Sequence, residues 1–405
     1  MAAAPAQVTP MEGTVTAALG FRAAGIHCGI KPDRPDLALV VSDVPASAAG
    51  TFTQIRTRSA PVILSERKLQ SGRAQAVLVN SGNANACTGP GGAADAQAMM
   101  DAAARALGIP EDLVVIASTG VIGRPLPMER ILPAIPRLVA ALGANGMAAA
   151  QAIMTTDAWP KTAAAQVHLG DGTVSIGAIA KGCGMIHPNM ATMIAIITTD
   201  AAVEPLLLRR ALRAAVDQTF NCISVDGDTS TSDSVFLLAN GAAGVAPIAA
   251  PDHRYQAFLA GLADVARRLA RMIVRDGEGA TRVVEIAVRG ARTDADARLV
   301  GRTIMTSLLV KTAFHGAELN WGRLAAAAGR SGADLDPDRL SIAIGDVEIV
   351  ADGVGLPDAY PKVQPLLAEP EVRVTLDLKL GSGAFVGWTN DLGETYVRIN
   401  SGYLS

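Results

Sequence analysis

The chain has 405 residues, which suits two or three domains at roughly 100–200 residues each. Half of the residues are apolar but only 3% are aromatic, so the cores consist mainly of Ala, Val, Leu and Ile. Lys and Arg number 35 against 38 Asp and Glu, and a net charge of −3 provides no basic field to attract a phosphate backbone. These values argue against a nucleic-acid partner and favour a globular protein that acts on a small molecule.

Targeting and metal-binding patterns are absent from the sequence. Residues 1–7 lack the basic segment and apolar run of a secretory signal, and the other apolar stretches are interrupted before the roughly 18 residues of a membrane span. We therefore expect a cytoplasmic protein without a membrane partner. The cysteines form no CxxC pair, so we expect no metal site and reduced, mostly buried thiols at Cys28, Cys87, Cys183 and Cys222.

Short strands alternate with helices in the first part of the chain. Residues 37–42 and 76–80 are apolar runs that end at polar or glycine residues, as buried strands do. Residues 93–107 carry apolar side chains at helical spacing, and Gly108 follows them as a helix terminator. This alternation indicates an α/β protein with helices layered on sheets.

The same alternation returns before a new pattern begins near residue 280. Strands are expected at 174–180 and 192–199, and a helix at 205–220 whose apolar side is formed by Leu206, Ala211, Leu212 and Val216. A partly alternating strand, 283–289, starts after the glycine-containing segment 276–280. We therefore place a domain boundary near residue 280.

The most unusual segment is residues 181–193, Lys-Gly-Cys-Gly-Met-Ile-His-Pro-Asn-Met-Ala-Thr-Met. Two glycines and a proline predict an irregular loop that leads into the strand expected from Thr192. A phosphate-binding loop is disfavoured because the GxxxxGK[ST] spacing is absent. A thiol nucleophile with a base, Cys183 with His187, is also disfavoured, because an i, i+4 pair needs a helix and this loop opposes one.

Thr192 is the other candidate nucleophile in this segment. A threonine hydroxyl inside a chain lacks a base, whereas an N-terminal threonine has an α-amine, with a pKa near 7.7–8.0, that can accept the hydroxyl proton. This chemistry needs the Ala191–Thr192 bond to break, by attack of the hydroxyl on the Ala191 carbonyl and hydrolysis of the ester. The spacing alone favours an ordinary strand threonine, because threonine is common in strands.

The segment closely resembles the self-cleaving signature of the ornithine acetyltransferase family, usually KG(S/A)GMIxPNMATM. Cys183 departs from the usual serine or alanine. Further blocks resemble that family in the same order and cover nearly the whole chain: Asn80–Gly89, Ser118–Gly123, Met154–Asp157 with Pro160 and Lys161, Ser224–Asp233, Asp276–Thr281, Leu309–Ala313 and Asn320–Arg323. Several long blocks in order are far more specific than one short motif.

The resemblance implies a layered αββα catalytic domain over residues 1–280 and a smaller α+β domain over 281–405. It implies cleavage into residues 1–191 and 192–405, assembled as a heterotetramer of two chains of each kind. The implied reaction moves an acetyl group from N2-acetylornithine to glutamate through acetyl-Thr192, which yields ornithine and N-acetylglutamate in arginine biosynthesis. No metal or bound cofactor is implied, and acetyl-CoA stays open as a second donor.

The family's site residues map onto this sequence position by position. Thr119 and Gly120 match the hydroxyl and backbone N–H that stabilise the oxyanion, although a Ser-Thr-Gly turn after a strand is also ordinary. Lys181 and Glu278 match the charged substrate pocket. Thr155 matches another substrate contact, with Thr156 as the alternative if the alignment shifts by one residue.

The C-terminal segment resembles the family's substrate-binding tail. Asn400 and Ser405 match its two contact positions, while Gly402 and Leu404 depart from the usual residues. Two other classes stay open: an N-terminal-nucleophile aminopeptidase or amidase of related fold, and a non-catalytic protein that cleaves itself for assembly. The charges of Lys181 and Glu278, with Asn400, favour the transferase, because a structural protein has no use for a charged pocket.

Overall fold

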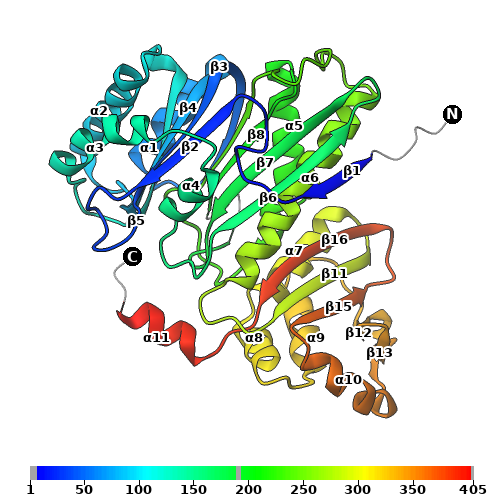
Figure 1. The fold of residues 1–405 in the computed structure, drawn as a ribbon. Coiled ribbons are helices and arrows are strands. Elements are labelled where there is room, and N and C mark those ends of the chain that lie inside the picture. The colour runs from blue at the N-terminus through cyan, green and yellow to red at the C-terminus, as the bar shows by residue number, and fades with distance from the viewer. Residues whose placement is uncertain (1–6, 188–192, 403–405) are drawn as a thin grey trace.

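The computed structural model describes residues 7–187 and 193–402. Ala191, Thr192 and Ser405 lie outside these ranges. The described residues form two β-sheets with helices on their faces (Figure 1). The first sheet contains β1 (Val8–Met11), β2 (Phe21–Ile26), β3 (Leu37–Phe52), β4 (Arg73–Asn83), β5 (Val114–Val121), β6 (Lys161–His168), β7 (Thr173–Lys181), β8 (Ile194–Thr199) and β10 (Ser234–Ala239). The second contains β9 (Ile223–Ser224), β11 (Val283–Ala291), β12 (Ser341–Ile344), β13 (Val347–Ala351), β14 (Val354–Gly355), β15 (Glu371–Asp377) and β16 (Gly383–Asn390).

The helices divide between the two sheets. The first part of the chain forms α1 (Ala60–Lys68), α2 (Gly89–Leu107), α3 (Met128–Ala140), α4 (Gly146–Ala152), α5 (Pro205–Asp217) and α6 (His253–Arg275). The second part forms α7 (Asp294–Met305), α8 (Leu308–His315), α9 (Trp321–Gly329), α10 (Tyr360–Leu367) and α11 (Glu394–Gly402). None of the helices in the described ranges is both long and apolar enough to cross a membrane.

The long strand β3 lets the first sheet fold over itself. Its first residues pair with β2 and β4, whereas residues 47–52 pair with β10. The register with β4 shifts between Val41 and Ala46, and such irregularities bend a strand and increase its twist. One continuous sheet can therefore supply two stacked layers.

Alternating side chains show this layering directly. In β4, Val77 faces the core between the two halves of the sheet, whereas Leu78 faces α2 and α3. In β8, Ile196 faces the same central core, whereas Ile197 faces α5 and α6. Figure 1 shows α2 and α3 beside the blue strands and α5 and α6 beside the green ones. Because successive strand residues point to opposite faces, these clusters give the order helix, sheet, sheet, helix. The structure confirms the predicted αββα class.

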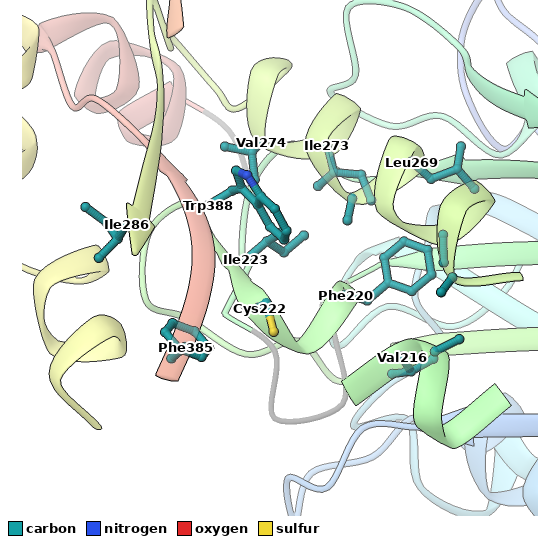
Figure 2. Close-up of a cluster of buried hydrophobic side chains, with 14 of the residues drawn as sticks. Val216, Phe220, Cys222, Ile223, Leu269, Ile273, Val274, Ile286, Phe385 and Trp388 are labelled. Atoms are coloured by element: carbon teal, nitrogen blue, oxygen red, sulfur yellow. The ribbon is translucent and has the colours of Figure 1, made fainter. Parts of the chain in front are cut away.

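The second sheet shares a hydrophobic core with the first part of the chain. Figure 2 shows Trp388 of β16 packed near Ile223 and near Val274 of α6. The short strand β9 also pairs in parallel with β16. The predicted boundary near residue 280 falls between α6 and β11, and the division into two domains stays a prediction.

The predicted elements occur, and several of their details need correction. The helix predicted at 205–220 ends at Asp217, because a 3-10 turn follows at Phe220–Cys222. Leu206 is 74% exposed, and the buried side of α5 instead contains Leu207 and Leu208. In the described residues β8 begins at Ile194. The cysteines are free as predicted, but only Cys183 and Cys222 are buried, whereas Cys28 is intermediate and Cys87 exposed.

Candidate active site

One cavity of about 180 Å³ brings together segments that lie far apart in the sequence. It is lined by all of the predicted site residues that the structure describes: Thr119, Gly120, Thr155, Lys181, Glu278 and Asn400. Thr192, Ala191 and Ser405 fall outside the described residues, so their roles stay predictions. The predicted site residues that the structure describes thus surround one cavity, which is formed by β5, β7, α11 and the loops between them.

The predicted oxyanion site lies near the carboxyl end of β5. Gly120 has a φ of +130°, and a Cβ atom there would lie 2.3 Å from the backbone carbonyl carbon of Gly82 on the neighbouring strand β4. Only glycine permits this conformation together with this approach. The requirement explains the glycine of the Ser-Thr-Gly block and fixes the backbone next to Thr119, which lines the cavity.

Lys181 is the last residue of β7 and is only 8% exposed. Its Nζ donates a hydrogen bond to Thr119 Oγ1 at 3.2 Å. An ammonium group can only donate, so the Thr119 oxygen accepts and its own O–H proton stays available for another acceptor. Lys181 therefore orients the hydroxyl that is predicted to stabilise the oxyanion, and its ammonium places a positive charge at the cavity wall.

Glu278 provides the opposite charge and is only 9% exposed. Thr156 Oγ1 donates to its Oε1 at 2.6 Å, and Asn400 Nδ2 donates to its Oε2 at 2.7 Å. A Cβ atom at Gly184 would lie 2.6 Å from the Glu278 carboxyl carbon, so the second glycine of the signature loop allows their close approach. Thr155 and Thr156 both line the cavity, and it is Thr156 whose hydroxyl contacts Glu278.

Helix α11 closes one side of the cavity through polar contacts. The Tyr396 hydroxyl donates to Asp226 Oδ2 at 3.1 Å, and Asp226 also accepts the backbone N–H of Met185 at 2.6 Å. Burial raises the pKa of Asp226. Figure 1 shows α11 reaching from the second sheet toward the first part of the chain. The sequence analysis did not predict Asp226 or Tyr396 as site residues. Tyr396 could have been found from its i, i+4 spacing to Asn400, because residues at this spacing lie on the same face of a helix.

The structure gives no support for a Cys183–His187 nucleophile pair. Cys183 Sγ lies 2.9 Å from Thr156 Oγ1, and burial raises the pKa of the Cys183 thiol, which opposes formation of the thiolate. His187 instead contacts Ser224 Oγ through Nδ1 at 3.1 Å and the Arg302 guanidinium through Nε2. Burial, with the Arg302 charge, lowers the pKa of His187 to about 4. The two side chains therefore have separate partners.

Comparison with known proteins decides the family. The model of the ArgJ family matches residues 22–405. The chain belongs to the ArgJ family. The arginine biosynthesis bifunctional protein ArgJ of Symbiobacterium thermophilum is 49% identical over 97% of this chain and 99% of its own length. The protein of the same name from Geobacter sulfurreducens is 48% identical over 95% of this chain and 98% of its own length.

Solved structures with similar sequences carry related names. The Bacillus halodurans arginine biosynthesis bifunctional protein ArgJ has 42% identity and a TM-score of 0.44, covering 47% of this chain and all of the solved chain. Ornithine acetyltransferase of Mycobacterium tuberculosis, solved with ornithine, has 42% identity and a TM-score of 0.43, covering 45% of this chain and 99% of the solved chain.

Proposed function

We propose that this ArgJ-family chain is an acetyltransferase of arginine biosynthesis that moves the acetyl group of N2-acetylornithine to glutamate through an acetyl-Thr192 enzyme. The observation that supports it most is the combination of opposite charges, Lys181 and Glu278, with the Thr119 hydroxyl and Gly120 in one cavity. The names of the relatives, arginine biosynthesis bifunctional protein and ornithine acetyltransferase, agree with this activity.

The charges in the cavity suit the two amino-acid substrates. N2-acetylornithine has one carboxylate and one side-chain ammonium, and glutamate has two carboxylates and the amine that receives the acetyl group. Lys181 attracts a carboxylate, whereas Glu278, held by Thr156 and Asn400, attracts an ammonium. Opposite charges on one wall therefore orient a zwitterionic substrate before reaction.

The proposed reaction consists of two successive acyl transfers, first to Thr192 and then to glutamate. The Thr192 α-amine accepts the hydroxyl proton while the hydroxyl oxygen attacks the acetyl carbonyl of the donor. The resulting oxyanion receives hydrogen bonds from the Thr119 hydroxyl and the Gly120 N–H, and its collapse releases ornithine, whose departing nitrogen takes the proton from the Thr192 α-ammonium. The glutamate amine then attacks the ester, one of its protons passes through the α-amine to the departing Thr192 oxygen, and N-acetylglutamate and free threonine result. These steps require no metal or bound organic cofactor, since the threonine itself carries the acyl group.

The proposal also covers chain cleavage, subunit assembly and a second acetyl donor. The free α-amine requires cleavage between Ala191 and Thr192, which yields residues 1–191 and 192–405. We expect these chains to assemble as a heterotetramer in the cytoplasm, with Ser405 as a further substrate contact. The word bifunctional in the relatives' names makes acetyl-CoA a second donor to test.

An acetyl-transfer assay tests the reaction directly. Purified protein with N2-acetylornithine and glutamate should produce ornithine and N-acetylglutamate in equal amounts, with parallel double-reciprocal plots. Donor without acceptor should leave one acetyl group on the chain that begins at Thr192, detectable by peptide mass spectrometry. Acetate release that does not depend on glutamate would instead identify an amidase, and acetyl-CoA in place of acetylornithine shows whether that donor also serves.

The pocket charges give a separate prediction. Glu278→Gln and Lys181→Met should each lower kcat/KM for acetyl transfer by about 10- to 150-fold, as expected for loss of a charge-assisted contact of about 1.5–3 kcal/mol. Each replacement keeps much of the side-chain volume, so the chain should still fold and cleave. Lys181→Met should lower kcat as well as raise KM, because Thr119 loses the donor that orients its hydroxyl. Parental kcat/KM in both folded variants would refute this pocket assignment.

A further inference from the structure

Three buried charged side chains form an ion cluster with no member among the residues that line the cavity. Lys161, the first residue of β6, places its ammonium 2.7 Å from Asp157 Oδ1 and 2.6 Å from Asp276 Oδ2. The side chains of Lys161 and Asp157 are fully buried, and that of Asp276 is 4% exposed. The proposed acyl-transfer steps use none of these three groups.

Each carboxylate of the cluster also holds a backbone segment. Asp157 accepts the N–H of Gly182 at 2.7 Å and that of Thr155 at 2.9 Å. Asp276 accepts the N–H of Ala158 at 3.0 Å. The Lys161 ammonium therefore joins the segment around Asp157, which also holds Gly182, to the segment that begins at Asp276. This link stands beside a direct hydrogen bond of 2.9 Å from the Glu278 N–H to the Cys183 carbonyl.

These three segments carry the residues that face the substrate. Gly182 directly follows Lys181, Asp276 precedes Glu278 by two residues, and Thr155 itself lines the cavity. Burial alone would raise the pKa of Asp157, but Lys181 and Lys161 lower it to about 2, so this carboxylate is ionised at neutral pH. Desolvating three charges is costly, and a buried ion cluster is weak evidence for stability alone. Its position fits a role in fixing geometry.

We propose that Lys161 is a positioning residue that fixes the spacing between Lys181 and Glu278, and thereby restricts the length of the amino-acid side chain accepted as donor. This inference rests on the proposed function, in which the two residues bind opposite charges of one substrate. A homologue that is one methylene longer moves its ammonium by about 1.3 Å along an extended chain. If the distance between Lys181 and Glu278 is fixed, the longer donor fits both charges poorly and is bound less well. If the two residues can move apart, the longer donor is accepted as well as acetylornithine.

The double variant Lys161→Met/Asp276→Asn tests the role of the cluster without changing its net charge. It removes one positive and one negative charge, so the cluster keeps the single negative charge of Asp157, which retains its two backbone donors. The matched control is Arg289→Gln/Asp377→Asn, which removes an ion pair of 2.9 Å on the second sheet, where the arginine side chain is 67% exposed. Asp276→Asn alone is the milder variant if the double variant does not fold.

Thermal melting and electrophoresis first establish that the parent, the double variant and the control variant fold and are cleaved. Two measurements are then compared among the three proteins. The first is the ratio of kcat/KM for N2-acetylornithine to that for N2-acetyllysine, which is one methylene longer. We expect the double variant to lower this ratio about tenfold, within the 10- to 200-fold range that one methylene can confer, mainly through the KM for acetylornithine. The second is amide hydrogen exchange, which should accelerate together in residues 155–158, 181–184 and 276–280. The control pair should change neither quantity.

The possible outcomes separate this inference from the proposed function. A folded, active double variant with the parental substrate ratio overturns the role of Lys161, as does unchanged exchange in the three segments. Faster exchange in all three with a lower ratio supports it. If the parent protein transfers no acetyl group from N2-acetylornithine, the proposed function fails and the claim about donor length fails with it, whereas the exchange measurement still decides whether Lys161 joins the segments.

Discussion

Replacing Thr192 with alanine is expected to abolish chain cleavage and to lower acetyl transfer on the order of 10⁴-fold or more, as removal of a catalytic nucleophile does in other acyl-transfer enzymes. Both reactions need the same hydroxyl, first against the Ala191 carbonyl and then against the donor acetyl group. The parent should migrate as two chains, of which the second begins Thr-Met-Ile-Ala by N-terminal sequencing. The variant should migrate as one chain.

Thr192→Ser is the matched control, since it keeps the hydroxyl and should retain part of both activities. Serine lacks the methyl group that restricts χ1, so its attack should be slower. Because an uncut Thr192→Ala chain also lacks the free α-amine, residues 1–191 should be coexpressed with a second chain that begins at residue 192. An assembled alanine variant that transfers acetyl groups at the parental rate, without an acetyl-enzyme in the mass spectrum, would show that Thr192 is not the nucleophile.

Thr119→Val should lower kcat for acetyl transfer by about 10²–10³-fold, the usual effect of removing one oxyanion donor, or about 2.7–4 kcal/mol. Valine has nearly the same shape as threonine, so β5 should keep its structure. Since the lost interaction is made in the transition state, kcat and kcat/KM should fall by similar factors in steady-state assays. The variant also leaves Lys181 without the oxygen that lies 3.2 Å from its ammonium.

Thr119→Ser is the control for this prediction, because it keeps the hydroxyl and should retain most of the parental kcat. Gly120 is unsuitable for the same test, since a Cβ atom would collide with Gly82 and disrupt the β4–β5 pairing. A Thr119→Val enzyme that folds, cleaves and keeps the parental kcat would show that the hydroxyl does not stabilise the oxyanion. In that case Lys181 would act on the substrate alone.

The family and the principal candidate site residues could be predicted from the sequence because the motifs that contain them are contiguous blocks. The loop around Thr192 and the Ser-Thr-Gly block of residues 118–120 have fixed order and spacing. The strands and helices also follow, since the period of apolar residues reflects the face that each element buries. This local information led to an α/β fold, and the resemblance to the family implied the αββα class, which the bent sheet confirms, and the residues that line the cavity.

Only the tertiary structure decided which groups surround those residues. Asp226 accepts a hydrogen bond from Tyr396, 170 residues further along the chain, and Lys161 contacts Asp276, 115 residues beyond it. Spacing along a chain carries no information about such distant contacts, because they depend on how whole layers pack and on which charges that packing leaves buried together.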